Sequence, residues 1–418
     1  MKIIIAHYKF YIQGGPERYL FKFISLAEKN GCEVIPFSVD YSRNRETPYS
    51  RYFVSPSSSV AEFGKTKLSL KQIIKDIRCE FHNPEAYRKI KELIREEKPD
   101  LLYVLIPGML SADIFRAAKE ENVPVILRIS DFRLLCPGMT LLRDGCTCEE
   151  CIYGNYLKAV KHCCVKKSKI LSILRAMSTH YARCKGRYNL VDAVITPPKF
   201  TADIFRKSGY FPSEKLFVNP TFIESSEYKI SKVSDNYVLC LGRFSPEKGF
   251  TYVVEAMRYI TDIPVKVAIT GDKDNCDASL IDIIEKYHLE DKVLFTGFLQ
   301  GEDLEELTSK ALCIAAPAIW YENLPNVVLE AYAYGKPVIA SRIGSLSEIV
   351  DEGITGLLFE VGNSKEIAEC IRTIYTDTEL RKRMGNSARI KCQKEYSPEA
   401  HWQRFIQIYE TVIRRGEV

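Results

Sequence analysis

The sequence has no hydrophobic run long enough to cross a membrane, no internal repeat of solenoid length and no low-complexity stretch. A membrane-spanning helix needs about 20 mostly apolar residues in succession. In the first residues, MKIIIAHYKF, one lysine and a short apolar run precede His7, which is too little for the core of a signal peptide. We therefore expect a cytoplasmic protein.

The composition also lacks the extremes that mark several protein classes. Hydrophobic residues make up 46% and charged residues 27%, a balance that excludes a disordered chain and a membrane bundle. The formal net charge of +5 is too small to indicate nucleic-acid binding, and we expect no nucleic-acid partner. The length of 418 residues is enough for two or three domains at roughly 150 residues each.

Short apolar segments alternate with longer amphipathic segments along the chain, a pattern typical of a parallel sheet with helices on both faces. In the first half we expect strands in KIIIAH, EVIPFSV, LLYVLI, PVILRIS and DAVITP. In the second half we expect them in YVLCLG, VKVAITG, KVLFTG, LCIAAP and PVIAS. Two such series predict two doubly wound, Rossmann-like α/β domains.

We place the amino-terminal domain at residues 1–200, the carboxy-terminal domain at 201–396 and a last helix at 397–418. The join is expected between Thr196 and Asp235, where the pattern breaks at TPPKF and the polar stretch SSEYKISKVSDN follows. In the last helix, Trp402 and Phe405 recur at helical spacing, and we expect this helix to cross back to the first domain. Doubly wound sheets bind ligands at the carboxyl ends of their strands, so we expect the site in a cleft between two facing domains.

Two loops at predicted strand ends contain residues suited to phosphate. In YIQGGPERY, Gly14 and Gly15 would let the backbone approach a phosphate at a helix amino terminus, although a tight turn without a ligand also explains the pair. In LGRFSPEKGF, Arg243 and Lys248 bracket a turn, and both residue types bind phosphate. A solvated charged loop is the alternative for the second motif.

A third loop, YENLPNVVLE, places Glu322 and Glu330 eight residues apart. Pro325 favours the first turn of a helix, which puts Glu322 in the preceding loop and Glu330 in the second turn. The amides of residues 323–326 would then favour an anion. Because a carboxylate there would repel phosphate, sugar hydroxyls are its natural partners. For Glu330, an acid that favours the helix dipole is a purely structural alternative.

Together, the two glutamates, GRFSPEKG, GGPE and AYAYGKPVIAS resemble glycosyltransferase family 4, which comprises retaining nucleotide-sugar transferases of the GT-B fold. The similarity covers nearly the whole chain and is more specific in the second half. It implies that Arg243 and Lys248 neutralise the donor diphosphate, that Glu322 contacts the transferred sugar and that Glu330 holds the ribose. We take Glu322, Arg243 and Lys248 as the catalytic residues. The other implied donor contacts are Gly14, Gly15, Gly242, Asn323, Leu324 and Asn326.

The resemblance also implies the partners. The donor would be a UDP- or GDP-sugar, and the acceptor a glycan or polyprenyl-linked molecule of surface-polysaccharide assembly, with no metal needed for catalysis. The segment LRISDFRLLCPG resembles a family segment that often reads His-Asp-Phe; here Ser130 replaces the histidine, while Asp131 is kept. We expect Ser130 and Asp131 to contact sugar or acceptor. A nucleotide-sugar epimerase and a catalytically silent GT-B scaffold remain alternatives.

Six closely spaced cysteines are compatible with a structural zinc that would stabilise an acceptor-side loop. They are Cys136, Cys146, Cys148, Cys151, Cys163 and Cys164. Only one C-x2-C pair, Cys148 and Cys151, occurs among them, so free thiols or labile disulfides remain the alternatives.

The segment that follows is basic and amphipathic. No acid occurs between Glu150 and Asp192, whereas nine lysines and arginines do. Apolar residues such as Ile170 and Met177 lie among them, as in helices that bind anionic membrane surfaces. The hypothesis is peripheral association with the inner face of a membrane; a helix packed on its own domain, with a solvated basic face, is the alternative.

Overall fold

The computed structural model describes residues 1–56, 79, 82–231, 233–271 and 278–416. The chain forms two compact units. Unit 1 contains Met1–Leu141, Cys148–Asn219 and Trp402–Val418, and unit 2 contains Leu142–Thr147 and Pro220–His401. No helix in the described part of the chain is both long and apolar enough to span a bilayer.

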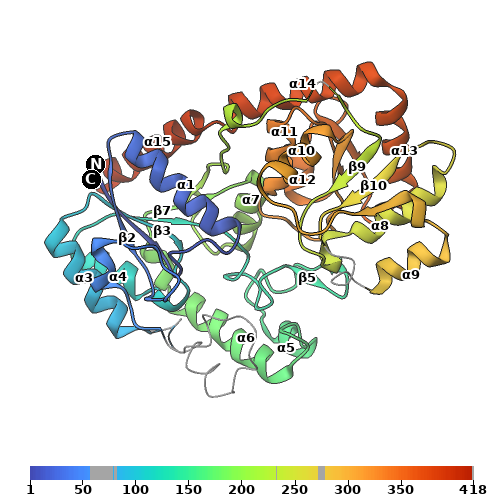
Figure 1. Ribbon diagram of the computed structural model, residues 1–418. Helices are drawn as coiled ribbons and strands as arrows, with labels where there is room; N and C mark the ends of the chain where they lie inside the picture. Colours follow the sequence, from blue (N-terminus) through green and yellow to red (C-terminus); the bar gives the residue numbers. More distant parts are fainter. Residues whose placement is uncertain (57–78, 80–81, 232, 272–277, 417–418) are drawn as a thin grey trace. The chain divides into compact units, whose positions relative to one another are not determined.

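Unit 1 is built on a six-stranded parallel sheet with the strand order β2-β1-β3-β4-β7-β8. Figure 1 labels β2, β3 and β7 of this sheet. The strands are β1 (Lys2–His7), β2 (Glu33–Phe37), β3 (Leu101–Ile106), β4 (Val125–Arg128), β7 (Ala193–Thr196) and β8 (Leu216–Val218). All residues of β3, β4 and β7 are buried, as expected for a parallel sheet covered by helices.

The longer helices of unit 1 begin at recognisable signals. They are α1 (Gly15–Lys29), α3 (Pro84–Glu97), α4 (Asp113–Glu120), α5 (Leu157–Lys161), α6 (Lys169–Cys184) and α7 (Lys199–Ser208). The Gly14 amide donates to the Glu17 carboxylate over 2.8 Å at the start of α1, and Asn83 and Ser168 cap α3 and α6 with their side chains.

Unit 2 is built on a second six-stranded parallel sheet with the order β11-β10-β9-β12-β13-β14. The strands are β9 (Tyr237–Cys240), β10 (Lys266–Ile269), β11 (Val293–Phe295), β12 (Cys313–Ala316), β13 (Val338–Ser341) and β14 (Gly356–Phe359). In chain order this arrangement reads 3-2-1-4-5-6, the order of a Rossmann fold, whose topological switch point lies between its first and fourth strands, here β9 and β12.

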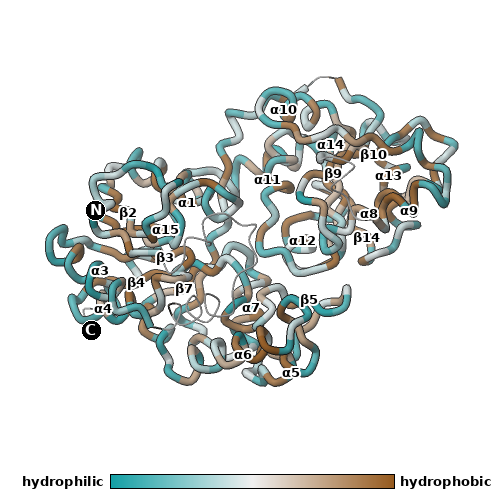
Figure 2. Tube along the Cα trace, turned by 60° about the horizontal axis from the view of Figure 1, so that its bottom comes forward, coloured by the Kyte–Doolittle hydropathy of each residue, from teal (hydrophilic) through white to brown (hydrophobic). Residues whose placement is uncertain are grey.

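The helices of unit 2 complete the doubly wound pattern. They are α8 (Phe250–Ala256), α9 (Ala278–Lys286), α10 (Gly301–Lys310), α11 (Asn326–Ala333), α12 (Gly344–Ile349), α13 (Ser364–Thr376) and α14 (Thr378–Glu395). Hydrophobic segments of β9, β10 and α8 lie together in the interior, where Val238, Val253 and Val267 belong to one buried cluster (Figure 2). The prediction of two doubly wound Rossmann-like domains is confirmed.

The units divide later in the chain than the sequence pattern suggested. The predicted boundary at residue 200 lies inside α7, and β8 then pairs with β7 in the sheet of unit 1. Pro198 is the residue that caps the start of α7, so the proline pair that broke the pattern precedes a helix of the same unit. A short antiparallel hairpin, β5 (Leu142–Arg143) and β6 (Cys146–Thr147), was not predicted.

The last helix, α15 (Pro398–Gly416), begins in unit 2 and belongs to unit 1 from Trp402 onward. Within unit 1 the Phe405 ring packs against Phe23 of α1, with centroids 4.9 Å apart, and against Tyr103 of β3, at 5.1 Å. The apolar face of this helix, which includes Phe405, therefore packs against the core of unit 1.

Candidate active site

The predicted catalytic residues of unit 2 lie in the two loops that leave the switch point of its sheet. Residues 241–249 follow β9 and residues 317–325 follow β12, and these two strands are neighbours in the sheet. Loops at such a point diverge to opposite faces of the sheet and leave a crevice between them. The topology therefore brings together side chains that are far apart in the sequence.

Lys248 and Glu322 meet across these loops. The Lys248 Nζ donates to Glu322 Oε1 over 2.5 Å, and the two side chains are 22% and 13% exposed. The indole Nε1 of Trp320 donates to the same oxygen over 3.0 Å. Glu322 thus holds the lysine in place and is itself held by a neighbour on its own loop.

Close backbone packing joins the two loops. The Ile319 amide donates to the Glu247 carbonyl over 3.0 Å. Gly249 has a φ of +71°, and a Cβ added there would lie 1.9 Å from the carbonyl oxygen of Pro317. Only glycine fits this contact without a shift of the backbone, so Gly249 sets the distance between the loops that bear Lys248 and Glu322.

The segment that follows β13 also contacts the main chain of Glu322. Ser345 in the first turn of α12 donates from its hydroxyl to the Glu322 carbonyl over 2.9 Å. Ser345 belongs to the segment RIGSLSEIV. The main-chain position of Glu322 is therefore fixed by a serine that the sequence reasoning did not single out.

The structure places Arg243 differently from Lys248. The Arg243 side chain is 79% exposed, and its Nη2 lies 3.8 Å from Glu247 Oε1 on the same loop. Gly242 adjoins the lysine instead: with φ +140°, its Cβ position would be 3.9 Å from Lys248 Cε. Lys248 is the residue held against Glu322, whereas Arg243 extends toward solvent.

The helix after the second loop starts at Asn326, one residue later than Pro325 would predict, because Pro325 is its N-cap. The Pro325 side chain makes no capping hydrogen bond to the first-turn amides of this helix. Glu330 lies in the second turn, as predicted. Burial raises the pKa of Tyr334 to about 12, and the negative charges of Glu305 and Glu330 add to this effect.

Two further residues of these loops were missed. Trp320 precedes Glu322 by two positions and donates to it, as described above. The Ser245 hydroxyl, in GRFSPEKG, is buried and has no hydrogen-bond partner in the described part of the chain. A hydroxyl in such a position is available to a ligand atom, and only the folded loop reveals it.

The remaining predicted contacts lie in unit 1. Gly14 is the N-cap of α1 in extended conformation, and Gly15 is its first residue. Ser130 and Asp131 follow β4 and line a small hollow at the ends of β3 and β4. Asp131 holds Arg133 through both carboxylate oxygens, with the shortest contact 2.7 Å from Nη2 to Oδ2.

His7, at the end of β1, is a buried polar residue of the same unit. Its Nδ1 accepts from the Lys9 amide over 3.0 Å, and its Nε2 has no hydrogen-bond partner within the described residues. Burial lowers the pKa of His7 to about 3, although the Lys9 carbonyl oxygen, 3.0 Å from Nδ1, opposes the shift; the positive charges of Lys9 and Arg133 add to it. The Glu17 carboxylate, 3.8 Å from Nε2, does not reverse this effect, and the imidazole is neutral.

The cysteine segment does not form a recognisable metal site. The thirteen cysteines that the structure describes form no disulfide with one another. Across the described ranges, no three histidine, cysteine or acidic side chains gather so that they could hold a metal ion. Cys151 is buried, and desolvation raises its pKa to about 12, with the charges of Cys136, Cys148 and Cys164 adding to the shift. The structural zinc gains no support from this arrangement and stays a prediction.

Comparisons with known proteins assign most of unit 2 to a described protein family. Residues 223–391 match the family described as Glycosyl transferases group 1. The N-acetyl-alpha-D-glucosaminyl L-malate synthase of Bacillus anthracis is 30% identical over 336 residues, 78% of each chain. The sulfoquinovosyl transferase SQD2 of Arabidopsis thaliana is 31% identical over 400 residues, covering 92% of this chain and 68% of the plant protein.

The fold also matches solved structures. The Anabaena protein HepE, crystallised in complex with UDP, aligns with a TM-score of 0.66 at 19% identity and covers 98% of this chain and 100% of its own. At that identity, the match supports the two-unit fold and no more.

Proposed function

Because the chain belongs to the Glycosyl transferases group 1 family, and is a glycosyltransferase that uses a nucleotide sugar, we propose that it transfers a hexose-type sugar with retention to a glycan or lipid-linked acceptor. The membership in glycosyltransferase family 4 and the role in surface-polysaccharide assembly are parts of the same proposal. The observation that carries it is the Lys248–Glu322 pair at the switch point of unit 2.

The charges of the pair suit the two ends of a nucleotide sugar. A lysine ammonium neutralises phosphate oxygens as a compact charge, and a carboxylate accepts hydrogen bonds from sugar hydroxyls. Lys248, assisted by the exposed Arg243, would stabilise the negative charge that develops on the leaving diphosphate. Positioned cations of this kind typically account for a factor of about 100 to 1,000 in rate.

Glu322 is better suited to hold the sugar than to attack it. Its Oε1 already accepts hydrogen bonds from Lys248 and Trp320, and both contacts draw electron density from the carboxylate. We therefore favour attack by the acceptor on the same face as the leaving diphosphate, which takes the acceptor's proton. A covalent glycosyl intermediate on Glu322 is the less favoured route.

The donor base follows from the relatives alone. HepE structures were solved with UDP and with UDP-glucose, and we propose a UDP-sugar for this chain, with Glu330 as the residue that holds the ribose. A thermal-shift series with UDP, GDP, ADP and TDP tests this choice. A larger stabilisation by GDP than by UDP would replace it.

The decisive experiment compares nucleoside diphosphate release from a panel of nucleotide sugars by the wild type and by Lys248→Ala. We expect release by the wild type and a loss of at least about 100-fold in the variant, with Glu322→Ala still binding the diphosphate. Lys365→Ala, an exposed lysine of α13, is the matched control and should keep full turnover. Equal rates for wild type and Lys248→Ala would refute the diphosphate role.

The same assay separates the two alternative functions. Formation of an epimerised nucleotide sugar without acceptor would identify an epimerase. No turnover of any donor, together with normal folding, would identify a scaffold subunit, the alternative that Ser130 raised.

A membrane surface is the proposed location of the acceptor. On α6, Ile170, Ile173 and Met177 are 57%, 38% and 65% exposed, and Lys166, Lys167 and Lys169 lie at its start; Figure 2 shows brown hydrophobic segments on α5 and α6. Lysines beside exposed apolar side chains match an anionic lipid surface. We expect the protein to sediment with vesicles that contain phosphatidylglycerol and not with pure phosphatidylcholine.

A double variant, Ile170→Ser with Met177→Ser, should abolish this sedimentation. Ile390→Ser, which alters an isoleucine of α14 that is 62% exposed in unit 2, should leave it unchanged. Equal sedimentation of all these proteins would contradict the membrane proposal without touching the transferase reaction.

A further inference from the structure

A hollow in unit 1 is lined by three arginines and by no acidic residue among the described residues. It is a small hollow of about 50 Å³ that is partly open to solvent. Its walls come from the segment after β4, from α6 and from the turn that follows α6. The arginines are Arg133, Arg175 and Arg187, and the hydroxyls of Ser178 and Thr179 stand beside Arg175 on α6.

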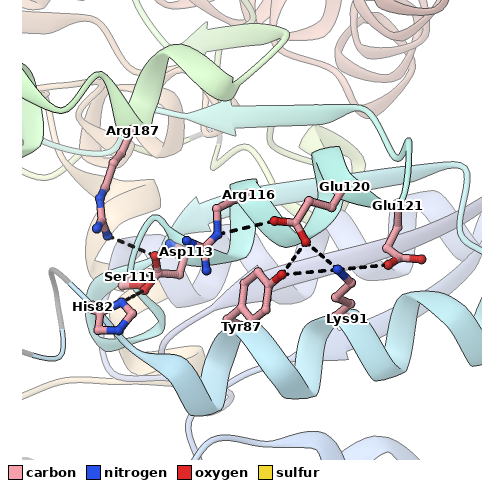
Figure 3. Close-up of polar contacts among 9 residues, drawn as sticks. All are labelled: His82, Tyr87, Lys91, Ser111, Asp113, Arg116, Glu120, Glu121 and Arg187. Carbon is pink, nitrogen blue, oxygen red and sulfur yellow. Dashed lines mark hydrogen bonds and ion pairs between the residues drawn. The ribbon is translucent and has the colours of Figure 1, made fainter.

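Two of these arginines are oriented by acids that stand outside the walls of this hollow. Arg187 Nη1 donates to Asp113 Oδ1 over 3.0 Å, and Asp113 is only 2% exposed. Figure 3 shows this carboxylate between Arg187 and His82, whose Nδ1 is 2.8 Å from Oδ2. Asp131 holds Arg133 in a bidentate pair, as described above. Held guanidinium groups lose less freedom when a ligand binds.

The hollow adjoins the place where a doubly wound sheet binds ligands. A second, smaller hollow at the ends of β3 and β4 shares Arg133, Leu134 and Tyr188 with the first and includes Ser130 and Asp131. The carboxyl ends of parallel strands are the ligand-binding edge of such sheets. A molecule seated at Ser130 would therefore extend toward the three arginines.

We infer that this arginine hollow binds a phosphate or carboxylate group of the acceptor. Guanidinium groups bind both oxyanions through paired N–H donors, and charge-assisted contacts of this type are about twice as strong as neutral ones. The inference rests on the proposed transferase function, because it assigns an anionic class of acceptor to that reaction. Arg175 acts here as a positioning residue, since it contacts a remote group of the acceptor and not the reacting atoms.

The test measures binding of a small phosphate ester, and not turnover. Glycerol 3-phosphate is titrated by calorimetry into protein that carries Lys248→Ala, so that the donor loop does not compete for phosphate, with glycerol as the neutral comparison. We expect glycerol 3-phosphate to bind and glycerol not to bind. Adding Arg175→Gln or Arg133→Gln should raise the Kd for glycerol 3-phosphate at least tenfold. Arg175→Lys keeps the positive charge but removes the paired N–H donors of the guanidinium group, so it should raise the Kd by less.

Arg95→Gln is the matched control, because Arg95 lies on α3, is 63% exposed and lines neither hollow. Unfolding curves of each variant check the fold. An unchanged Kd for glycerol 3-phosphate in folded Arg175→Gln and Arg133→Gln proteins, together with unchanged binding of Arg175→Gln to vesicles that contain phosphatidylglycerol, would overturn the inference. Nucleoside diphosphate binding by the wild type is measured separately, so a failed donor site and a failed acceptor hollow give different results.

The source of the anion is resolved by a second arm with vesicles of phosphatidylcholine with and without phosphatidylglycerol. If Arg175→Gln weakens binding of glycerol 3-phosphate in solution, a water-soluble phosphate is sufficient. If it weakens only the binding to phosphatidylglycerol vesicles, and Arg95→Gln does not, the anion belongs to a lipid headgroup. If Arg175→Gln weakens neither the binding of glycerol 3-phosphate nor the binding to phosphatidylglycerol vesicles, the proposed site is refuted.

Discussion

Both units contain an ion pair that joins residues 74 positions apart, and the two pairs were not equally predictable. In unit 2, Lys248 and Glu322 lie on loops that leave neighbouring strands, β9 and β12. In unit 1, Asp113 starts α4 and Arg187 lies in the turn after α6. The strand-order rule of doubly wound sheets covers the first case, but no comparable rule covers the second.

The two ion pairs are also held in place by different contacts. The unit 2 pair depends on close backbone packing at Gly249, and the unit 1 pair depends on a buried carboxylate. Damage to the first should alter geometry and rate, whereas damage to the second should alter stability. Two predictions test this difference, and a third concerns a buried histidine of unit 1; the largest effect is expected in unit 2.

Replacement of Gly249 by alanine should reduce turnover by about 100-fold, because a misplacement of about 1 Å in a catalytic group costs that much. The added Cβ would lie 1.9 Å from Pro317 O, so the loop that carries Lys248 must move. Donor turnover is the measurement. Gly353→Ala is the control: it also has a positive φ, +74°, but no atom lies within 4 Å of its Cβ position, so turnover should be retained. Wild-type turnover in Gly249→Ala would show that loop spacing is not critical.

Replacement of Asp113 by alanine should destabilise unit 1 by about 3 kcal/mol, because it leaves the Arg187 charge and the Asn83 amide without this carboxylate. Hydrogen exchange should show faster opening of amides in β3 and β4, while β9 and β12 are unchanged. Asp203→Ala, which removes the exposed partner of Arg206, should cost less than about 1 kcal/mol. Faster exchange in β9 would contradict the separation of the two effects.

The smallest effect concerns His7 and appears only in acid. The folded-state pKa of His7 is about 3, below its usual value of 6.5, so the unfolded chain binds this proton first as the pH falls. Stability is therefore fully present above about pH 6.5 and is lost toward pH 3, with a loss of about 2 kcal/mol at pH 5.

The His7→Asn variant keeps an acceptor for the Lys9 amide and removes this titration. Hydrogen exchange of β1 and β3 at pH 7.5 and pH 5.0, corrected for the intrinsic rate, measures the effect. The wild type should lose more stability than the variant over this interval. Equal losses would mean that His7 is protonated in the folded chain.

Much of the fold was predictable from short stretches of residues. All ten expected strands occur, because each is a short segment whose apolar character is visible without knowledge of its neighbours. The edge strands β8 and β14 were missed, since both are short and each leaves residues partly exposed. The domain boundary was misplaced because Pro198 ends one pattern and starts α7 of the same unit.

The residue types and their order were enough to indicate two Rossmann-like sheets and to place Lys248 and Glu322 on strand-end loops, where their contact with a donor stays a prediction. That these two side chains meet follows from the strand order, because loops on neighbouring strands meet wherever the strands do. Folding in three dimensions added what no local pattern contains. It separated Arg243 from the pair, brought Trp320 and Ser345 to Glu322, and assembled three arginines of unit 1 around one hollow. Those contacts depend on how helices and turns pack, and packing is set by side chains distant in the sequence.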